Sequence, residues 1–401
     1  MWTLGKWKLS VLGLIVIVII GIAFYFTNND KASLASKDVF IDKLQKDLIK
    51  NSKAVVYYST TIDAPTKNSL ALFISNDNKV QALKMDGLEL GSTTYNDDQK
   101  TLLVEDKNSL KFITDAGITT QTFKQNEHTG TKTGYLSKGQ TFYSLYNTGV
   151  LKDNGYESTI RYGNTEKTNQ LSVSEWAREA TDNGVDTIYA MVEYYPSANE
   201  GAAFRLVQAK LDKHNNLKEK KISELSAISN LENSNFISGL HYKDHHIYSI
   251  FSNTGEDEDA PNYYELLDYD LAQKKLTRKP LPQYENSYIV ADDSLMIGDN
   301  IYYAEREGDV ARLNVQTGKT KTLYNLFDLS GYTDAAEEGN HLVRITDDKT
   351  YFIYPKKNGN YYLDIFDLKT GKKLSSDALE NMKEILAAND TVFPYDLEII
   401  D

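Results

Sequence analysis

A short hairpin-like phrase recurs through the second half of this 401-residue chain, and it constrains the fold more than any other feature. In each copy an alternating apolar run stops at Asp or Asn, a polar turn follows, and a lysine-rich alternating run begins. The clearest copies begin at Phe366 (FDLKTGKKL) and Arg312 (RLNVQTGKTKTL), and looser ones begin at Asp268 and Lys210. Apolar alternation with a period of two is typical of β-strands, so each phrase predicts a β-hairpin. Its recurrence indicates a repeat architecture.

The Asp or Asn that ends the first strand of each hairpin measures the repeat. Seven such residues can be placed along the chain: Asp86, Asp115, Asn164, Asp212, Asp270, Asn314 and Asp367. Their mean spacing is about 47 residues, within the range of roughly 40–50 residues for propeller blades. The interval of 29 residues between Asp86 and Asp115 is the exception, and it questions the placement of the second blade.

Over roughly residues 54–401 the chain resembles the β-propeller superfamily, and the hairpin phrases carry the resemblance. It implies an all-β fold of about seven blades, each with four antiparallel strands. Gly318 and Gly371, in the turns QTGK and KTGK, would supply the positive φ of a tight hairpin turn. The sequence has no Trp-Asp dipeptide, no kelch-type Gly-Gly pair and no YWTD motif, so no particular subfamily is indicated. An array of β-sandwiches is the structural alternative.

Two further patterns concern the edges of the blades. Lysines gather at or after the final turn of each unit, where they would discourage edge-to-edge pairing of the outer strands; a basic binding belt is the alternative. These are Lys218, Lys220, Lys221, Lys274, Lys275, Lys279, Lys319, Lys321, Lys372 and Lys373. The last alternating segment, from Thr391, contains Pro394 and is predicted to close the ring by pairing with the first blade.

Helical patterns are few and short. Three candidate helices lie around Trp176, Leu225 and Met382. Ahead of the strands, residues 36–51 (SKDVFIDKLQKDLIKN) place apolar side chains at intervals of four with charges on the remaining faces. This pattern predicts a short amphipathic helix that packs against the domain.

The N-terminal segment predicts a membrane anchor. Residues 9–26 (LSVLGLIVIVIIGIAFYF) carry no charge and as a helix would reach about 27 Å, close to the bilayer core. Lys6 and Lys8 precede them, so the positive-inside tendency places the N-terminus in the cytoplasm and the remainder outside. A signal peptide cleaved near residues 33–35 is the competing interpretation, but the length of the apolar stretch favours an uncleaved anchor.

These features predict three regions: residues 1–30 as a cytoplasmic tip and transmembrane anchor, 31–53 as an amphipathic linker helix, and 54–401 as an extracytoplasmic β-propeller. The chain has no cysteine, which excludes disulfides and cysteine-based catalysis. An exported, cysteine-free domain suggests a single-pass protein in the cell membrane of a Gram-positive-type bacterium. The net charge of −13 argues against nucleic acid as a partner.

Catalytic and cofactor motifs are absent from the sequence. It contains no GxSxG, Walker A, HExxH, EF-hand or GxGxxG pattern. The histidine cluster of His241, His245 and His246 lies beside Asp244, but a strand would bring about two of these to one face, fewer than a transition metal needs. We therefore expect no cofactor and no metal.

Predicted loop lengths point to a binding surface. The connection between the second and third strands is expected to be long in three consecutive blades, at residues 148–157, 196–203 and 253–262. It is expected to be short in the first, second and sixth blades, at residues 76–78, 106–108 and 306–308. Neighbouring long loops would crowd one sector of one face, and loops on a rigid scaffold are where binding usually occurs. Loop drift without function is the alternative.

Tyrosines and carboxylates are predicted to rim this sector, a composition suited to a protein or glycan partner. The predicted binding residues are Tyr156, Tyr194, Tyr195, Glu200, Glu256, Asp257, Glu258, Asp259, Tyr263 and Tyr264. For the acidic run at 256–259, a solvated loop and a calcium site are alternatives, although the run lacks the alternate spacing that calcium ligands adopt.

Together these features predict a membrane-anchored extracytoplasmic propeller that binds an envelope protein or a cell-wall component without catalysis. One alternative is a propeller enzyme that hydrolyses glycans with a pair of carboxylates in the central funnel. Another is a structural assembly factor of an envelope complex, whose anchor contacts a second membrane helix.

Overall fold

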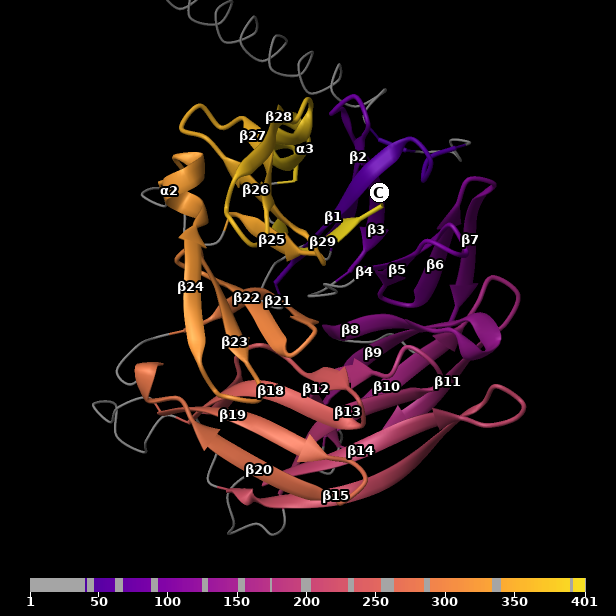
Figure 1. Ribbon diagram of the computed structural model, residues 1–401. Helices are drawn as coiled ribbons and strands as arrows, with labels where there is room; N and C mark the ends of the chain where they lie inside the picture. The colour runs from indigo at the N-terminus through magenta and orange to yellow at the C-terminus, as the bar shows by residue number, and fades with distance from the viewer. Residues whose placement is uncertain are drawn as a thin grey trace, which may run out of the picture.

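The computed structural model describes residues 40–41, 47–61, 68–87, 93–124, 129–150, 156–173, 175–195, 203–229, 234–253, 263–284, 289–333, 340–389 and 392–400. Seven antiparallel sheets fill this part of the chain and stand around a common centre as the blades of a β-propeller (Figure 1). The predicted all-β propeller of seven four-stranded blades is thereby confirmed, and the array of sandwiches is excluded.

The blades are numbered in chain order, and their strands are given from the inner to the outer edge. Blade 1 contains β29 (Val392–Ile399), β1 (Ser52–Thr60), β2 (Asn68–Ser75) and β3 (Val80–Asp86); blade 2 contains β4 (Thr93–Asn96), β5 (Thr101–Asp106), β6 (Ser109–Thr114) and β7 (Gly117–Thr122); blade 3 contains β8 (Thr129–Leu136), β9 (Thr141–Val150), β10 (Tyr156–Gly163) and β11 (Thr168–Val173). Blade 4 contains β12 (Trp176–Asp182), β13 (Thr187–Tyr194), β14 (Ala203–Leu211) and β15 (Leu217–Ser229).

Blade 5 has a divided inner strand, because β16 (Ser234–Phe236) and β17 (His241–Lys243) both pair with β18 (His246–Asn253); β19 (Tyr263–Asp270) and β20 (Lys275–Pro280) follow. Blade 6 contains β21 (Ala291–Ile297), β22 (Asn300–Glu305), β23 (Asp309–Asn314) and β24 (Thr320–Asn325); blade 7 contains β25 (Leu342–Ile345), β26 (Lys349–Pro355), β27 (Tyr361–Asp367) and β28 (Lys373–Ala378). Two short helices, α2 (Leu326–Ser330) and α3 (Met382–Ala387), and two 3₁₀ turns, Lys138–Gln140 and Pro282–Tyr284, lie between strands.

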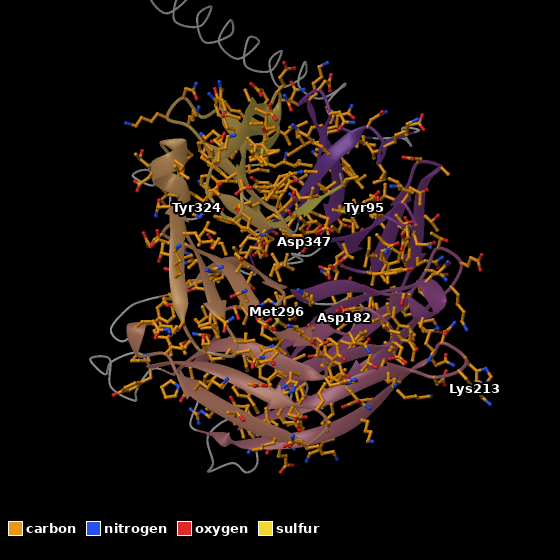
Figure 2. The ribbon with its side chains drawn as sticks, in the orientation of Figure 1. Tyr95, Asp182, Lys213, Met296, Tyr324 and Asp347 are labelled. Atoms are coloured by element: carbon orange, nitrogen blue, oxygen red, sulfur yellow. The ribbon has the colours of Figure 1, made fainter. Side chains whose placement is uncertain are left out.

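The inner strands form a closed ring around the centre of the molecule. Contacts run from β29 to β4, β8, β12, β17, β21 and β25, and then back to β29. Figure 2 shows Tyr95, Asp182 and Met296 of these inner strands gathered around the centre, whereas Lys213 and Tyr324 lie at the periphery. Side chains of the inner strands therefore determine the chemistry of the central channel.

The ring closes as predicted, through the C-terminal strand. β29 pairs antiparallel with β1, from Ile399 opposite Ala54 to Val392 opposite Thr60. The register shifts between Tyr57 and Tyr58, where Pro394 lies opposite Tyr58. A proline, which has no N–H to donate, is tolerated on such an innermost edge strand near a bulge.

The repeated Asp or Asn caps the turn between the third and fourth strands. Asn314 and Asp367 accept hydrogen bonds from the N–H groups of Thr317 and Thr370, each at 2.9 Å. Both turns end with a glycine in the left-handed region, at φ 70° for Gly318 and 68° for Gly371. These are Asx turns, in which the side chain replaces a backbone acceptor. The recurring phrase is thus the signature of one turn type.

The short interval between Asp86 and Asp115 results from the way blade 1 was marked. Asp86 ends β3, the outer strand, whereas the corresponding turn between the third and fourth strands of this blade lies at residues 76–78. The mark of the first blade was therefore placed one strand too late, and blade 2 was placed correctly. The connection at residues 76–78 consequently does not lie between second and third strands.

Two of the three predicted helices are strands. Trp176 begins β12 and Leu225 lies in β15, because cross-strand pairing with β13 and β14 outweighs the local helical pattern. The helix around Met382 is confirmed as α3, and α2 at Leu326–Ser330 was missed. The strand that begins at Trp176 borders the central channel.

The segment before β1 is described only at residues 40–41 and 47–51, and these residues are not helical. Phe40 forms an isolated bridge with Ala82, and residues 47–50 form a turn. Leu48 and Ile49 are buried in the core of blades 1 and 2, so this segment packs against the domain as expected. The described residues do not adopt the predicted helical conformation. The first strand begins at Ser52, two residues before the predicted boundary.

The predicted anchor at residues 9–26 lies outside the described residues. Among the residues described, no helix has the length and apolarity needed to cross a bilayer. The predicted lysine pattern can be compared with the strands: the lysines lie on or beside β15, β20, β24 and β28, which are the outer strands of blades 4 to 7. Their positions agree with protection of exposed sheet edges.

Ring closure predicts that Leu397 and Leu374, both on strands near the C-terminus, contribute differently to the stability of the fold. Leu397 on β29 is 1% exposed, whereas Leu374 on the outer strand β28 is 51% exposed. Leu397→Ala should lower the free energy of unfolding by about 2–5 kcal/mol, because it opens a cavity where the ring closes. Leu374→Ala should change it by less than about 0.5 kcal/mol. Chemical denaturation of the full chain measures both, and equal effects would contradict the role given to β29.

Candidate functional site

The face that carries the connections between second and third strands is called the loop face here. The three connections predicted to be long join β9 to β10, β13 to β14 and β18 to β19, as expected, and they belong to the consecutive blades 3, 4 and 5. The contrast in length is smaller than predicted, because blade 1 carries residues 61–67 in the same position and blade 7 carries residues 356–360. Side-chain composition, more than length, sets blades 3 to 5 apart.

Five of the predicted binding residues lie outside the described part of the chain: Glu200, Glu256, Asp257, Glu258 and Asp259. Three of the predicted tyrosines are exposed at the roots of the long loops, with exposed fractions of 38% for Tyr156, 60% for Tyr195 and 53% for Tyr263. Tyr264 was wrongly placed on the rim. It is 4% exposed, and its hydroxyl accepts a hydrogen bond from the N–H of Ile289 at 2.9 Å. Neighbouring residues in a strand face opposite sides, so only Tyr263 points outward.

An aromatic–arginine patch, made of Tyr156, Trp176, Arg178, Glu193 and Tyr195, joins blades 3 and 4 on the loop face. The ring of Tyr156 stacks on Trp176 with centroids 5.4 Å apart, and the Arg178 guanidinium lies 4.4 Å from the Trp176 ring. Glu193 binds Arg178 at 3.1 Å and accepts a hydrogen bond from the Tyr195 hydroxyl at 3.1 Å. Each of these side chains thus orients the next, so the exposed rings are restricted in the free protein.

Tyr194 extends the patch on the other side of β13. The guanidinium of Arg205 lies 3.9 Å from the Tyr194 ring and forms an ion pair with Glu175 at 2.6 Å. Sequence reasoning found the tyrosines but missed Trp176, Arg178 and Arg205, because the segment around Trp176 was assigned to a helix. Trp176 is the only tryptophan after residue 7, and this was the available signal.

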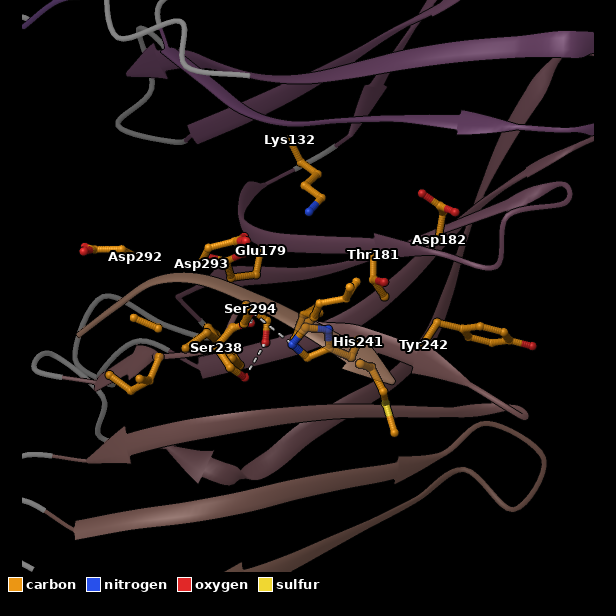
Figure 3. Close-up of a pocket in the computed structure, with 17 residues that line it drawn as sticks. Lys132, Glu179, Thr181, Asp182, Ser238, His241, Tyr242, Asp292, Asp293 and Ser294 are labelled. Atoms are coloured by element: carbon orange, nitrogen blue, oxygen red, sulfur yellow. Dashed lines mark hydrogen bonds between the residues drawn. The ribbon is translucent and has the colours of Figure 1, made fainter. Parts of the chain in front are cut away.

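A second site lies in the channel at the centre of the ring. A cavity of about 460 Å³ is bounded by the inner strands of blades 3, 4, 5 and 6 (Figure 3). Its polar lining includes Lys132 from β8, Glu179 from β12, His241 from β17 and Asp293 from β21. A volume of this size is typical of small-ligand sites.

All four inner strands around the cavity are irregular. The register shifts between Gly130 and Lys132 in β8, between Ala177 and Glu179 in β12, and between Ala291 and Asp293 in β21. Each shift places a charged residue directly after the bulge, and bulges re-aim side chains and are frequent beside active sites. Sequence patterns did not reveal these residues, because one extra residue in a short strand leaves no mark in a period-two pattern.

In blade 5 the irregularity is larger. Residues 237–240 separate β16 from β17 while their partner β18 continues without a break. The Ser238 hydroxyl accepts from the N–H of Ile250 at 2.9 Å, in place of a carbonyl of a regular ladder. Gly239 adopts φ 65°, and a Cβ at this position would lie 3.5 Å from Oε2 of Glu179. The divided strand therefore brings backbone close to the Glu179 carboxylate.

Several carboxylates of the channel are engaged in holding the ring together. Arg344 on β25 contacts Glu398, and its guanidinium lies 3.7 Å from Asp396 and 3.9 Å from Asp293. The same carboxylates accept backbone N–H bonds across blade boundaries: Asp293 from Ile345 at 2.6 Å, Asp396 from Thr93 at 2.8 Å and Glu398 from Tyr95 at 2.9 Å. Burial raises the pKa of Glu398 to about 7 in spite of the nearby Arg344.

Two charged residues of the cavity differ from these. Glu179 is half-buried and Lys132 is exposed, and neither has a hydrogen bond or an ion pair with any described residue. Burial raises the pKa of the Glu179 carboxyl to about 7, with the charges of Lys132 and Arg178 opposing the rise. Figure 3 shows Lys132 reaching into the cavity from above the strand that carries Glu179. The two groups face the same space without meeting.

The histidine cluster of the sequence separates in three dimensions. His241 lines the cavity, with Nε2 3.2 Å from the Ser294 hydroxyl, whereas His246 bonds Asp268 at 2.7 Å on the side of blade 5. Burial lowers the pKa of His241 to about 4, so its ring is neutral at pH 7. In the described part of the chain, no three His, Cys, Asp or Glu side chains are grouped as metal ligands.

The raised pKa of Glu179 predicts a pH dependence of stability. Between pH 4.5, its ordinary value, and about 7, the folded chain keeps a proton that the unfolded chain releases, so the stability contributed by Glu179 falls as pH rises through this window. In Glu179→Gln the melting temperature should therefore fall less steeply over this range than in the parent chain. Thermal melts at several pH values measure the slopes, with Glu166→Gln, at an exposed turn, as the control. Parallel profiles for parent and Glu179→Gln would refute the assignment.

Comparison with known proteins identifies the family. The model of the family described as "YycP, beta-propeller domain" matches residues 47–400. A relative from Bacillus subtilis (strain 168), named "Uncharacterized protein YycP", is 23% identical over 413 residues, which cover 98% of this chain and 99% of the relative.

Solved structures resemble the chain at low sequence identity. The chain is similar to AztD of Citrobacter koseri, at 13% identity and a TM-score of 0.42 over 88% of this chain and 87% of that one. It is also similar to the tricorn protease, at 9% identity and a TM-score of 0.47 over 89% of this chain and 36% of that one. Because the family model spans nearly the whole propeller, the chain belongs to the YycP β-propeller family.

Proposed function

We propose that this chain is a membrane-anchored extracytoplasmic binding protein, and that the loop face of blades 3 to 5 holds an envelope protein or a cell-wall component. The observation that carries the proposal is the aromatic–arginine patch, where Tyr156 and Tyr195 are exposed on either side of Trp176 and Arg178. Tyr, Trp and Arg are the residue types that dominate binding energy at protein interfaces.

The side chains of the patch are also preorganised for binding. Stacking of Tyr156 on Trp176 and the bonds from Glu193 to Arg178 and Tyr195 restrict these side chains in the free protein. Less conformational entropy is then lost on binding, which favours affinity. Tyr263 at the start of β19 in blade 5 is also exposed, and we propose that the acidic residues at 200 and 256–259 add negative charge to the binding surface.

The state of the channel carboxylates favours binding over glycan hydrolysis. Glycosidases use one carboxyl group as acid and a second as base or nucleophile. Asp293, Asp396 and Glu398 are engaged by Arg344 and by backbone N–H groups, and Asp182 accepts from Tyr143 and Gly184, both at 2.7 Å. Glu179 is therefore left without a second unengaged carboxylate among the described residues that line the cavity.

The anchor and the outside location come from the sequence alone, from the uncharged stretch at residues 9–26 with Lys6 and Lys8 before it. They place the propeller where an envelope partner is available. In the alternative role of an assembly factor with the same topology, the anchor helix, not the loop face, makes the essential contact.

A photo-crosslinking amino acid at Tyr195, in the full chain in its own cells, should join the protein to one discrete partner. The same amino acid at Leu374, which is similarly exposed on the outer strand of blade 7, serves as the matched control. Trp176→Ala should weaken binding of the purified partner at least tenfold, since loss of a central aromatic anchor costs about 2 kcal/mol. Equal crosslinking at both positions, or an unchanged affinity, would contradict the proposal.

A separate experiment tests the orientation of the chain across the membrane. Protease added to intact cells without their wall should digest the propeller while a tag placed before Lys6 stays protected, because the anchor keeps the N-terminus inside. Recovery of the propeller in the culture medium, without residues 1–33, would instead support a cleaved signal peptide. Exchange of residues 9–26 for an unrelated membrane span should preserve function; its loss would favour the assembly-factor role.

A further inference from the structure

We propose that the central cavity binds a compact zwitterion, in particular a short peptide with free ends, whose ammonium group meets Glu179 and whose carboxylate meets Lys132. The proposal concerns the channel and is independent of the partner held at the loop face. It derives from three features of the cavity: its unpaired charges, its polar walls and its size.

The unpaired charges remain after all others in the cavity are accounted for. Asp182 accepts from the Tyr143 hydroxyl and the Gly184 N–H, Asp292 binds His341 at 2.8 Å, and Asp293 is held by Arg344 and the Ile345 N–H. Lys132 and Glu179 alone among the described charged residues of the lining lack such a partner, and they do not pair with each other. One positive and one negative group therefore face the same cavity.

A zwitterion fits this arrangement better than a ligand with a single charge. Burial disfavours the charged form of Glu179 and raises its pKa, although the charges of Lys132 and Arg178 oppose the rise. An ammonium group at Glu179 would relieve this cost, but a purely cationic ligand would add a positive charge close to Lys132. A carboxylate on the same ligand removes this repulsion and forms a second charge-assisted hydrogen bond.

The remaining walls offer hydrogen bonds between the two charges. Thr181 and Ser294 present hydroxyl groups, and the bulged segment at residues 237–240 brings irregular backbone to the cavity. His241 is neutral, so it adds hydrogen-bonding capacity without charge. Backbone and hydroxyl groups of this kind suit the amide bonds of a peptide.

The size of the cavity indicates a ligand larger than a single small amino acid. A volume of about 460 Å³ lies in the range of pockets that enclose small organic ligands, and it corresponds to a peptide of about two or three small residues. The exposed Lys132 shows that the cavity is open to solvent on its side, so a ligand can enter without unfolding of a blade.

Calorimetric titration of the purified full chain tests the proposal with four probes: di-alanine and tri-alanine with free ends, N-acetyl-tri-alanine, and tri-alanine amide. At least one free peptide should bind with one-to-one stoichiometry, and each blocked peptide should bind at least tenfold more weakly, because it lacks one charge. Absence of binding by both free peptides at millimolar concentration would overturn the proposal. Equal binding of free and blocked peptides would overturn it as well.

Two variants assign the ends of the ligand. Glu179→Gln should weaken binding of the free peptide at least tenfold and leave binding of N-acetyl-tri-alanine unchanged. Lys132→Gln should also weaken binding of the free peptide at least tenfold, and it should leave binding of tri-alanine amide unchanged. Glu166→Gln and Lys218→Gln, both at exposed positions outside the channel, are the matched controls and should bind like the parent. Melting temperatures close to that of the parent chain show that the variants fold. Identical loss in the variants and the controls, or no loss in either variant, would refute the assignment.

Discussion

The pairing of β29 with β1 is the interaction on which the rest of the structure depends. It joins the two ends of the described chain in one blade and converts seven sheets in a row into a ring. Only in a closed ring does each inner strand contact an inner strand on both sides. β29 completes the ring because it contacts both β4 and β25. The channel, its cavity and the shared faces between blades 7, 1 and 2 all follow from this one set of backbone hydrogen bonds.

The channel shows how one ring of similar positions can divide into two roles. Bulges in the inner strands place Lys132, Glu179 and Asp293 toward the centre. On one side Arg344 gathers three carboxylates, and backbone N–H groups complete their coordination, so these charges stabilise the ring. On the other side Lys132 and Glu179 keep no partner among the described residues. A bulge thus precedes a structural charge in blade 6, Asp293, and the two available charges in blades 3 and 4.

The surface proposed to bind a partner, on the loop face, is separate from this structural centre. Its aromatic–arginine patch stands on the ends of β10, β12 and β13. β10 and β13 are held by ladders on both sides, and β12 pairs with β13. Mutations in the patch can therefore change recognition without loss of the fold. Tyr264 illustrates the boundary, since one step along β19 from the exposed Tyr263 leads into the core. In a strand, a single residue decides between surface and interior.

The sequence by itself determined the repeat, the seven blades, the closing strand, the lysine-protected outer edges and three exposed tyrosines. These follow from local rules, namely period-two alternation, Asx turns with glycine at Gly318 and Gly371, and the cost of unpaired edges. Only the tertiary structure decided that Trp176 lies in a strand, where it stacks with Tyr156, and that Glu179 and Lys132 face one cavity. Strand pairing overrode the local helical pattern in the first case. In the second, bulges of one residue and contacts between blades far apart in sequence set the side-chain directions, and neither leaves a periodic trace in the chain.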